Sequence, residues 1–277
     1  PISDDLEFTA ANGWTQPVFE AKLANLAAAL KATHNSVGPD LLAVCEIEKD
    51  TLLEQLLAAA GLTKLKVVKD PSGTRDLRGI DVAMAYDATQ LNVIFTQSHT
   101  VHLRFPTRDI FEVVFEIKAS GEQFVVIASH WPSRRQGKFE SEPVRIAVAE
   151  NLAYLVERHV KVSAQAYEEL RAANDLATVQ RQWEKKILLC GDFNDEPGDR
   201  SVVEHLRASR ELERVLGAGN DISKFAKETA AYRAQEVFLF NPMWRFAGLP
   251  NTGTHFFEGS ATSGPQTNRY NLLDQID

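Results

Sequence analysis

The sequence is poor in cysteine, with only Cys45 and Cys190 among 277 residues. Two thiols cannot build the disulfide framework that stabilises small secreted domains. Both stand in apolar stretches, so we expect two buried free thiols. No spacing of Cys and His typical of a zinc site occurs. The fold must therefore rely on an apolar core, which this length can supply as one large α/β domain or two small ones.

Long apolar runs are missing too. No stretch approaches the roughly 18 residues that cross a membrane, and no signal peptide is evident. The net charge of −8 disfavours broad adhesion to nucleic acid or anionic membranes, although it is compatible with a small basic cleft. The chain begins with Pro rather than Met, so the sequence leaves open a cytoplasmic protein or one secreted after processing. The oligomeric state is also open, and we expect a monomer.

The chain contains no repeat, low-complexity tract or linker. Periodicity and turn residues predict helices at 17–33, 51–60, 142–184 with a break near 161–163, and 200–216, and Gly61 is expected to end the second of them as a C-cap. Apolar runs predict strands at "LLAVCEIE", several between 65 and 128 with a hairpin at Ser120-Gly121, "ILLCGD" and the start of "NLLDQID". This order of elements favours a mixed sheet or two packed sheets.

Polar side chains stand at or near the ends of strands that look buried. They are Glu46 after "LLAVC", Asp81 in "GIDVAMAY", His130 after "FVVIAS", Asp192 and Asn194 after "ILLCG", and Asp274 after "NLL". A lone Asp or Asn there is most often a turn former, and we interpret the nearby Asp195 in that way. Burying charge without a partner is costly, however, so the set as a whole predicts one polar cluster at one end of the sheet. Carboxylate and amide oxygens suit Mg²⁺ or Mn²⁺.

Four segments, in order, carry a resemblance: "LLAVCEIE", "ASHWPSRRQG", "LLCGDFNDEPGD" and "NLLDQID". Together they resemble the endonuclease/exonuclease/phosphatase superfamily over nearly the whole chain. The resemblance implies an α/β (α+β) fold, a four-layer sandwich of two mixed β-sheets packed face to face with helices on the outside. It also implies a single domain over residues 1–277 and Mg²⁺- or Mn²⁺-dependent hydrolysis of a phosphoester.

The resemblance also implies roles for the polar residues. Glu46 matches the metal ligand, and His130 matches a histidine that contacts the scissile phosphate. Asp81 stands where an acid orients that histidine, and Asp274 where an acid orients a second one. Asp192 and Asn194 match the pair that handles the attacking water and the phosphate.

Basic residues near His130 and Asp81 are candidates for binding the phosphate, because guanidinium forks match its geometry. They are Arg134, Arg135 and Lys138, together with Arg75 and Arg78. Any one of them is as often ordinary solvated surface, so the sequence alone leaves both interpretations open.

Two family features have no counterpart in the sequence: the opening strand that carries an Asn and the closing Ser-Asp-His strand. We therefore expect a domain that is incomplete at both ends and weak activity of these residues alone. The leading interpretation is a nuclease or related phosphodiesterase. The alternatives are a phosphatase or sphingomyelinase-type phospholipase acting on a small or lipid phosphoester, or a catalytically dead binding domain. A lipid substrate would call for an exposed aromatic hairpin, and the one candidate, 238–250, is interpreted as core or loop packing.

Overall fold

The structure is a computed structural model that describes residues 9–69, 73–216, 222, 228–256 and 270–276. The chain divides into two compact units, Pro1–His130 and Trp131–Asp277. The predicted single domain over 1–277 stays a prediction.

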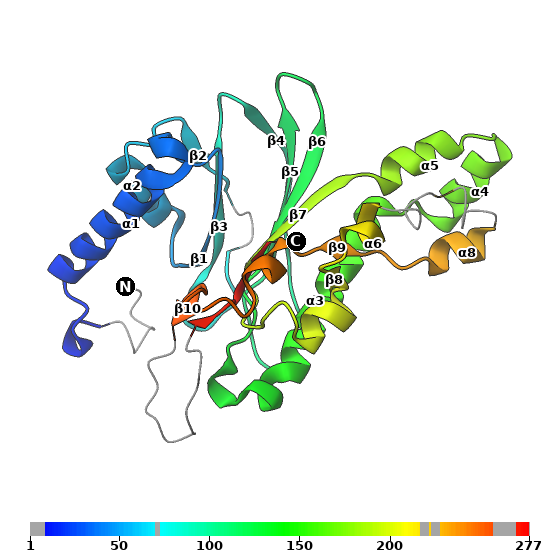
Figure 1. Cartoon of the computed structure of the whole chain (residues 1–277). Helices are drawn as coiled ribbons and strands as arrows, with labels where there is room; N and C mark the ends of the chain where they lie inside the picture. Colours follow the sequence, from blue (N-terminus) through cyan, green and yellow to red (C-terminus); the bar gives the residue numbers. More distant parts are fainter. Residues whose placement is uncertain (1–8, 70–72, 217–221, 223–227, 257–269, 277) are drawn as a thin grey trace. The chain divides into compact units, whose positions relative to one another are not determined.

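The first unit contains a three-stranded antiparallel sheet in the order β1-β3-β2, where β1 is Leu41–Ile47, β3 Asp81–Asp87 and β2 Leu65–Val67. A short 3-10 turn, η1 (Ala10–Asn12), precedes helix α1 (Gln16–Ser36), and helix α2 is Asp50–Ala59. Both helices lie on one side of the sheet (Figure 1), and α2 buries Leu53, Leu56 and Leu57. The predicted stop at Gly61 is confirmed, because its φ of 71° allows the reversal that ends α2.

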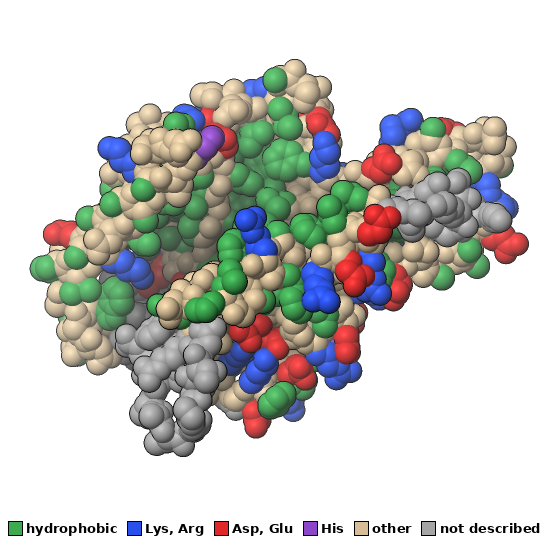
Figure 2. Space-filling model, in the orientation of Figure 1, with side chains coloured by type: hydrophobic (Ala, Val, Ile, Leu, Met, Phe, Trp, Pro, Cys, Tyr) green, Lys and Arg blue, Asp and Glu red, His purple; other side chains and the backbone are tan. Residues whose placement is uncertain are grey.

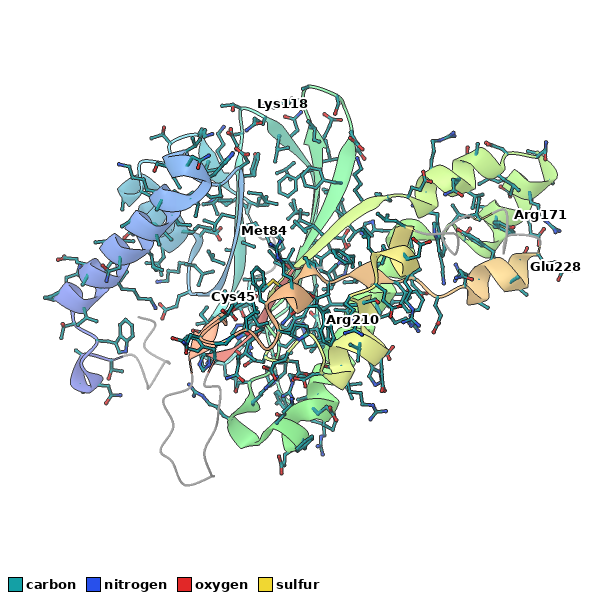
Figure 3. The ribbon with its side chains drawn as sticks, viewed as in Figure 1. Cys45, Met84, Lys118, Arg171, Arg210 and Glu228 are labelled. Atoms are coloured by element: carbon teal, nitrogen blue, oxygen red, sulfur yellow. The ribbon has the colours of Figure 1, made fainter. Side chains whose placement is uncertain are left out.

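Three further antiparallel strands complete the first unit. They are β4 (Leu91–His99), β5 (Ile110–Ile117) and β6 (Gln123–Ala128), and the predicted hairpin joins β5 to β6. Strand β3 packs against β5 and β6, and the rings of Tyr86 and Phe115 lie 5.5 Å apart. Met84 on β3, labelled in Figure 3, is fully buried. Two sheets therefore pack face to face in this unit, with helices outside β1-β3-β2.

The second unit joins helices to short strand pairs. Its longer helices are α3 (Lys138–Val160), α4 (Ala164–Ala172) and α5 (Leu176–Trp183). Strand β7 (Lys186–Asp192) pairs antiparallel with β12 (Asp274–Ile276). The smaller elements are η2 (Arg134–Gln136), η3 (Ser201–His205), β8 (Ala208–Ser209), α6 (Leu212–Leu216), α8 (Thr229–Ala234), β9 (Leu239–Phe240), η5 (Pro242–Phe246), β10 (His255–Phe256) and β11 (Tyr270–Asn271).

Several local expectations are corrected. The helix predicted over 200–216 is wrong: Arg207, with φ of 62°, breaks it and is followed by β8, which pairs with β9. The break near 161–163 is confirmed, and a second break separates α4 from α5 at Asn174, whose φ is 57°. Cys45 and Cys190 are half-buried rather than buried. Segment 238–250, which we interpreted as core or loop packing, contains β9 followed by the 3-10 turn η5, where Arg210 lies 5.6 Å from the Trp244 ring (Figure 3 labels Arg210).

The mixed α/β class predicted from the sequence is confirmed. Figure 2 shows acidic and basic side chains interspersed on the visible face of the second unit. Within the part of the chain that is described, no helix is long and apolar enough to cross a membrane.

Candidate active site

Glu46 lies in an irregular part of the first sheet. The β1–β3 register pairs Val44 with Ala83 and then Ile47 with Asp81, so a bulge falls between Val44 and Ile47. Glu46 takes a left-handed conformation there, with φ of 58°. A non-glycine residue rarely adopts this conformation, and such backbone strain clusters at functional sites. Its side chain is exposed, so the bulge presents a carboxylate to solvent beside the start of β3.

Asp81 opens β3 and is buried, with 8% of its surface exposed. One of its carboxylate oxygens, Oδ1, accepts a hydrogen bond of 2.8 Å from the backbone N–H of Val82. The register places Asp81 opposite Ile47, the residue after Glu46. The two acids predicted from the sequence thus lie on neighbouring strands at the same end of the sheet.

A buried ion-pair cluster precedes β3 and β5. Asp76 accepts hydrogen bonds from the backbone N–H of Arg78 at 2.9 Å and from its Nε at 3.2 Å, and it pairs with Arg108 at 3.3 Å. The Asp76 and Arg108 side chains are 8% and 7% exposed. Burial tends to raise the pKa of Asp76, but the Arg78 hydrogen bonds and both guanidinium charges hold that pKa below its ordinary value. Arg78 and Arg108 thus share the carboxylate of Asp76.

His130 follows β6 and is buried in the same electrostatic environment. Burial, followed by the charges of Arg108 and Arg78, lowers its pKa to about 3 against the opposing effect of Asp76. The imidazole is therefore neutral at pH 7. The charge of Asp76, a residue that the sequence did not suggest, acts on His130. The predicted orientation of His130 by Asp81 stays a prediction.

The second unit holds Asp192 and Asn194 at the end of β7. The backbone N–H of Asn194 donates to Asp192 Oδ1 at 2.8 Å, and Asn194 Nδ2 donates to the carbonyl of Trp131 at 3.0 Å. Asn194 has a φ of 51°, a conformation that Asn tolerates better than most residues. Trp131 stacks on Phe193 with ring centroids 4.4 Å apart. One of the two amide protons of Asn194 is thus committed to the fold.

Asp274 lies directly opposite Asp192 in the β12–β7 register. Side chains opposite each other in an antiparallel pair are close, and like charges there destabilise the pair. The backbone N–H of Asp274 donates to Thr254 Oγ1 at 3.1 Å, and Asp274 is exposed while Asp192 is half-buried. Two facing carboxylates beside an asparagine form a donor set that favours a positively charged partner.

The interpretation of Asp195 as only a turn residue is wrong. It is fully buried, and its Oδ2 lies 2.7 Å from Nε of Arg145, which is fully buried as well. Its Oδ1 accepts from Arg134 at 3.1 Å, and Ser201 Oγ donates to its Oδ2. Burial raises the pKa of Asp195 against the effect of these partners. Asp195 is therefore the centre of a buried charge network.

Three of the candidate phosphate-binding arginines have different environments. Arg134 is committed to protein oxygens: its Nε donates to the Asn194 carbonyl and its NH2 group to Asp195 and Asp199. Arg78 pairs with Asp76 and keeps 34% of its side chain exposed. Arg135 is exposed. Phosphate binding by these arginines stays a prediction.

Sequence reasoning missed four residues of these clusters: Asp76, Arg108, Arg145 and Asp199. The sequence did contain a signal for Arg108, because "TRD" directly precedes the buried strand "IFEVVFEI". The other polar candidates were identified by the same feature, a position next to an apolar strand. Arg145 carried no such signal, since an arginine within a helix is usually solvated.

The fit of the chain to a divalent metal can be tested on the donor sets. Across the residues that the structure describes, no group of three His, Cys, Asp or Glu side chains is placed to hold a metal ion. The facing carboxylates of Asp192 and Asp274 and the exposed carboxylate of Glu46 nevertheless have the hard-oxygen chemistry that Mg²⁺ and Mn²⁺ prefer. The residues present thus offer the type of oxygen ligand that such an ion binds.

The fold and these clusters define a sandwich protein with acidic and amide side chains at strand ends. The sequence profile of the Endonuclease/Exonuclease/phosphatase family matches residues 1–252. The chain belongs to this family, and the resemblance stated from its motifs is confirmed. No curated protein matches it in sequence.

Solved structures of similar fold share little sequence with the chain. A mannosyl-6-phosphatase from Bacteroides thetaiotaomicron is 14% identical, with a TM-score of 0.51, over 93% of this chain and 76% of that one. The human Nocturnin catalytic domain with bound sulfate is 14% identical, with a TM-score of 0.50, over 92% and 74%. A family protein of B. thetaiotaomicron is 12% identical, with a TM-score of 0.51, over 93% and 74%. These likenesses support the predicted sandwich fold.

Proposed function

We propose that this chain is a metal-dependent phosphodiesterase whose substrate is nucleic acid. The observation that carries this proposal is the pair of guanidinium groups, Arg78 and Arg108, that share Asp76 and whose charges act on the buried neutral imidazole of His130. Arg78 keeps 34% of its side chain exposed, so its guanidinium can also meet a ligand. A phosphodiester is anionic, and guanidinium donors match the geometry of its oxygens.

The neutral imidazole of His130 has a distinct task in this proposal. With a pKa near 3 it holds no proton to give as an acid at pH 7. It can still donate one N–H to a phosphoryl oxygen, and that contact strengthens as negative charge builds up in the transition state. Arg78, which keeps a third of its side chain exposed, would bind a phosphate oxygen in the first unit. Arg135, which is exposed in the second unit, would also bind phosphate. Asp81 would orient His130.

Asp192 and Asn194 supply the proton transfer and positioning in the second unit. Asp192 would accept a proton from the attacking water, since its carboxylate is held in place by the Asn194 N–H. Asn194 would use its remaining amide proton to hold an oxygen without adding negative charge. Asp274 would act beside Asp192 on the same pair of strands. A Mg²⁺ or Mn²⁺ ion on Glu46, when bound, would supply charge neutralisation at the phosphoryl group.

A phosphatase is the second candidate, because a mannosyl-6-phosphatase has a similar fold. A phosphate monoester carries about two negative charges near neutral pH, so it requires more positive charge at the site than a diester does. A lipid substrate is less well supported, because segment 238–250 forms a short strand and a 3-10 turn and includes the buried Asn241.

The test compares nicking of plasmid DNA with release of inorganic phosphate from monoesters, in Mg²⁺ and in Mn²⁺. We expect nicking, and we expect Asp192→Asn and Glu46→Gln each to lower it by about 10²-fold or more while the melting temperature stays within a few degrees. Calorimetric titration with Mg²⁺ should show saturable binding that Glu46→Gln weakens. Release of phosphate from monoesters without nicking would replace this proposal with a phosphatase, and absence of metal binding would favour a dead binding domain.

A further inference from the structure

A network of charged side chains lies beneath the loop that carries Asp192 and Asn194. Five side chains of the second unit form it, and we call them the loop-support network: Arg134, Lys138, Arg145, Asp195 and Asp199. Arg145 and Asp195 are fully buried, and Arg134 and Asp199 keep 19% and 13% of their side chains exposed. This degree of burial sets the network apart from surface ion pairs.

Arg134 joins the network to the loop. Its Nε donates to the backbone carbonyl of Asn194, and its NH2 group donates to Asp195 Oδ1 at 3.1 Å and to Asp199 Oδ2 at 2.6 Å. A guanidinium is planar and its donors point in fixed directions, so three acceptors bound to it are fixed relative to one another. Arg134 therefore sets the plane of the peptide that follows Asn194.

The other side of the network is anchored in helix α3. Arg145 pairs with Asp195 through Nε, donates to Ser141 Oγ at 2.6 Å, and donates to the carbonyl of Lys138 at 2.7 Å. Lys138 in turn pairs with Asp199. The loop after β7 is thus bound through charged groups to the first turns of α3.

A third anchor reaches the same loop from β12. Gln275 is 1% exposed, and its Nε2 donates to the backbone carbonyl of Asp195 at 3.1 Å while its Oε1 accepts from Asn241 at 3.0 Å. The carbonyls of Asn194 and Asp195 are therefore each held by a side chain from a distant part of the second unit.

Stability alone does not explain such a network. Taking these charges out of water costs several kcal/mol per ion, and apolar residues of similar size often serve stability as well or better. Apolar residues cannot fix the orientation of the peptide groups in the loop, because this requires directional hydrogen bonds. A displacement of about 1 Å in a catalytic group can cost about 10²-fold in rate.

We propose that Arg134 is a positioning residue, which acts with Asp195 and Arg145 to hold Asp192 and Asn194 in the orientation that catalysis needs. This inference rests on the proposed function of Asp192 and Asn194. It differs from the expectation that Arg134 binds the phosphate, because the guanidinium fork is turned toward the protein's own oxygens.

The test is Arg134→Lys, which keeps the positive charge and loses the fork. On a chromogenic aryl phosphodiester we expect kcat to fall by about 10²-fold with KM changed by less than about two-fold. Hydrogen exchange of the backbone amides of Asn194 and Glu196 should become at least about ten-fold faster, because both amides donate to carboxylates of this loop. Arg200→Gln is the matched control, since its ion pair with Glu204 is exposed; it should leave kcat, KM and the exchange rates unchanged.

The contrary outcome is a rise in KM with kcat and amide exchange preserved, which would make Arg134 a phosphate contact and overturn the inference. If Arg134→Lys does not fold, Ser201→Ala replaces it, because this change removes only the hydroxyl that donates to Asp195. Unchanged exchange and kcat in Ser201→Ala would count against the network in the same way. Hydrogen exchange needs no substrate, so it decides the positioning even if the wild-type chain hydrolyses no phosphoester and the proposed function fails.

Discussion

The buried imidazole of His130 makes the stability of the protein depend on pH. In the folded chain its pKa lies at about 3, because burial and the charges of Arg108 and Arg78 oppose protonation. In the unfolded chain an exposed histidine has a pKa of about 6.5. As pH falls below that value, the unfolded state binds a proton that the folded state does not bind. Protonation therefore favours unfolding, and the contribution of His130 to stability is present above about pH 6.5 and lost below it.

The size of the effect follows from the two pKa values. Each pH unit between them corresponds to about 1.4 kcal/mol of unfolding free energy. At about pH 4.5 the unfolded state is almost fully protonated at this histidine and the folded state almost not at all. The loss there is about 2.7 kcal/mol relative to about pH 7.5. A loss of this size is a substantial part of the roughly 5–15 kcal/mol by which folded domains are stable.

The assay is urea unfolding of the wild-type chain and of His130→Asn at about pH 7.5, 6.5, 5.5 and 4.5, which follows the slope of the linkage. Asparagine keeps a buried polar group but does not titrate. Carboxylates with a lowered pKa, such as Asp76 and Asp87, contribute less to the unfolding free energy as pH falls. This loss occurs in both proteins, so it cancels when the unfolding free energy of the variant is subtracted from that of the wild-type chain. We expect the wild-type chain to lose about 2.7 kcal/mol more than the variant by about pH 4.5. A difference that stays constant with pH would refute a buried neutral His130.

Two further predictions concern stability. Replacing Arg145 by Met should lower the unfolding free energy by about 3–5 kcal/mol in urea titrations, because the carboxylate of Asp195 stays buried but loses its ion pair with Arg145. If the loss were no larger than that caused by Arg200→Met at an exposed position, the importance of the buried pair would be contradicted. Ser163 caps α4 by accepting from the backbone N–H of Ala166 at 3.1 Å, so Ser163→Ala should cost about 1 kcal/mol, and Ser163→Asp, which keeps an acceptor, should restore it.

Polar residues at strand ends show how far the sequence can identify a site. Asp81 and Asp87 bound the same strand, β3, and both are buried. Asp87 belongs to the turn: its carboxylate accepts from Thr89 and Gln90 and pairs with Lys64. Pattern alone cannot separate the two, because each is an acid next to a run of apolar residues. Only the partners around each carboxylate distinguish a turn from a candidate site.

The sequence by itself determined the features that arise from short-range physics. Apolar periodicity identified β1, β7 and the helices α1 and α2, and Gly61 marked the end of α2. The motif "GDFN" located Asp192 and Asn194 at the end of β7 because an apolar strand followed by polar turn residues is a local signal. The family resemblance then followed from four motifs in order.

The tertiary structure alone decided which charges are buried and which groups they meet. Asp195 looked like a turn residue until Arg145, from a helix 50 positions earlier in the chain, proved to lie 2.7 Å away. Burial lowers the pKa of His130, and the charges of Arg108 and Asp76, which are 32 positions apart, act on it in opposite directions. Burial and long-range pairing determine the energy of an ionisable group, and neither is a property of the residues next to it in sequence.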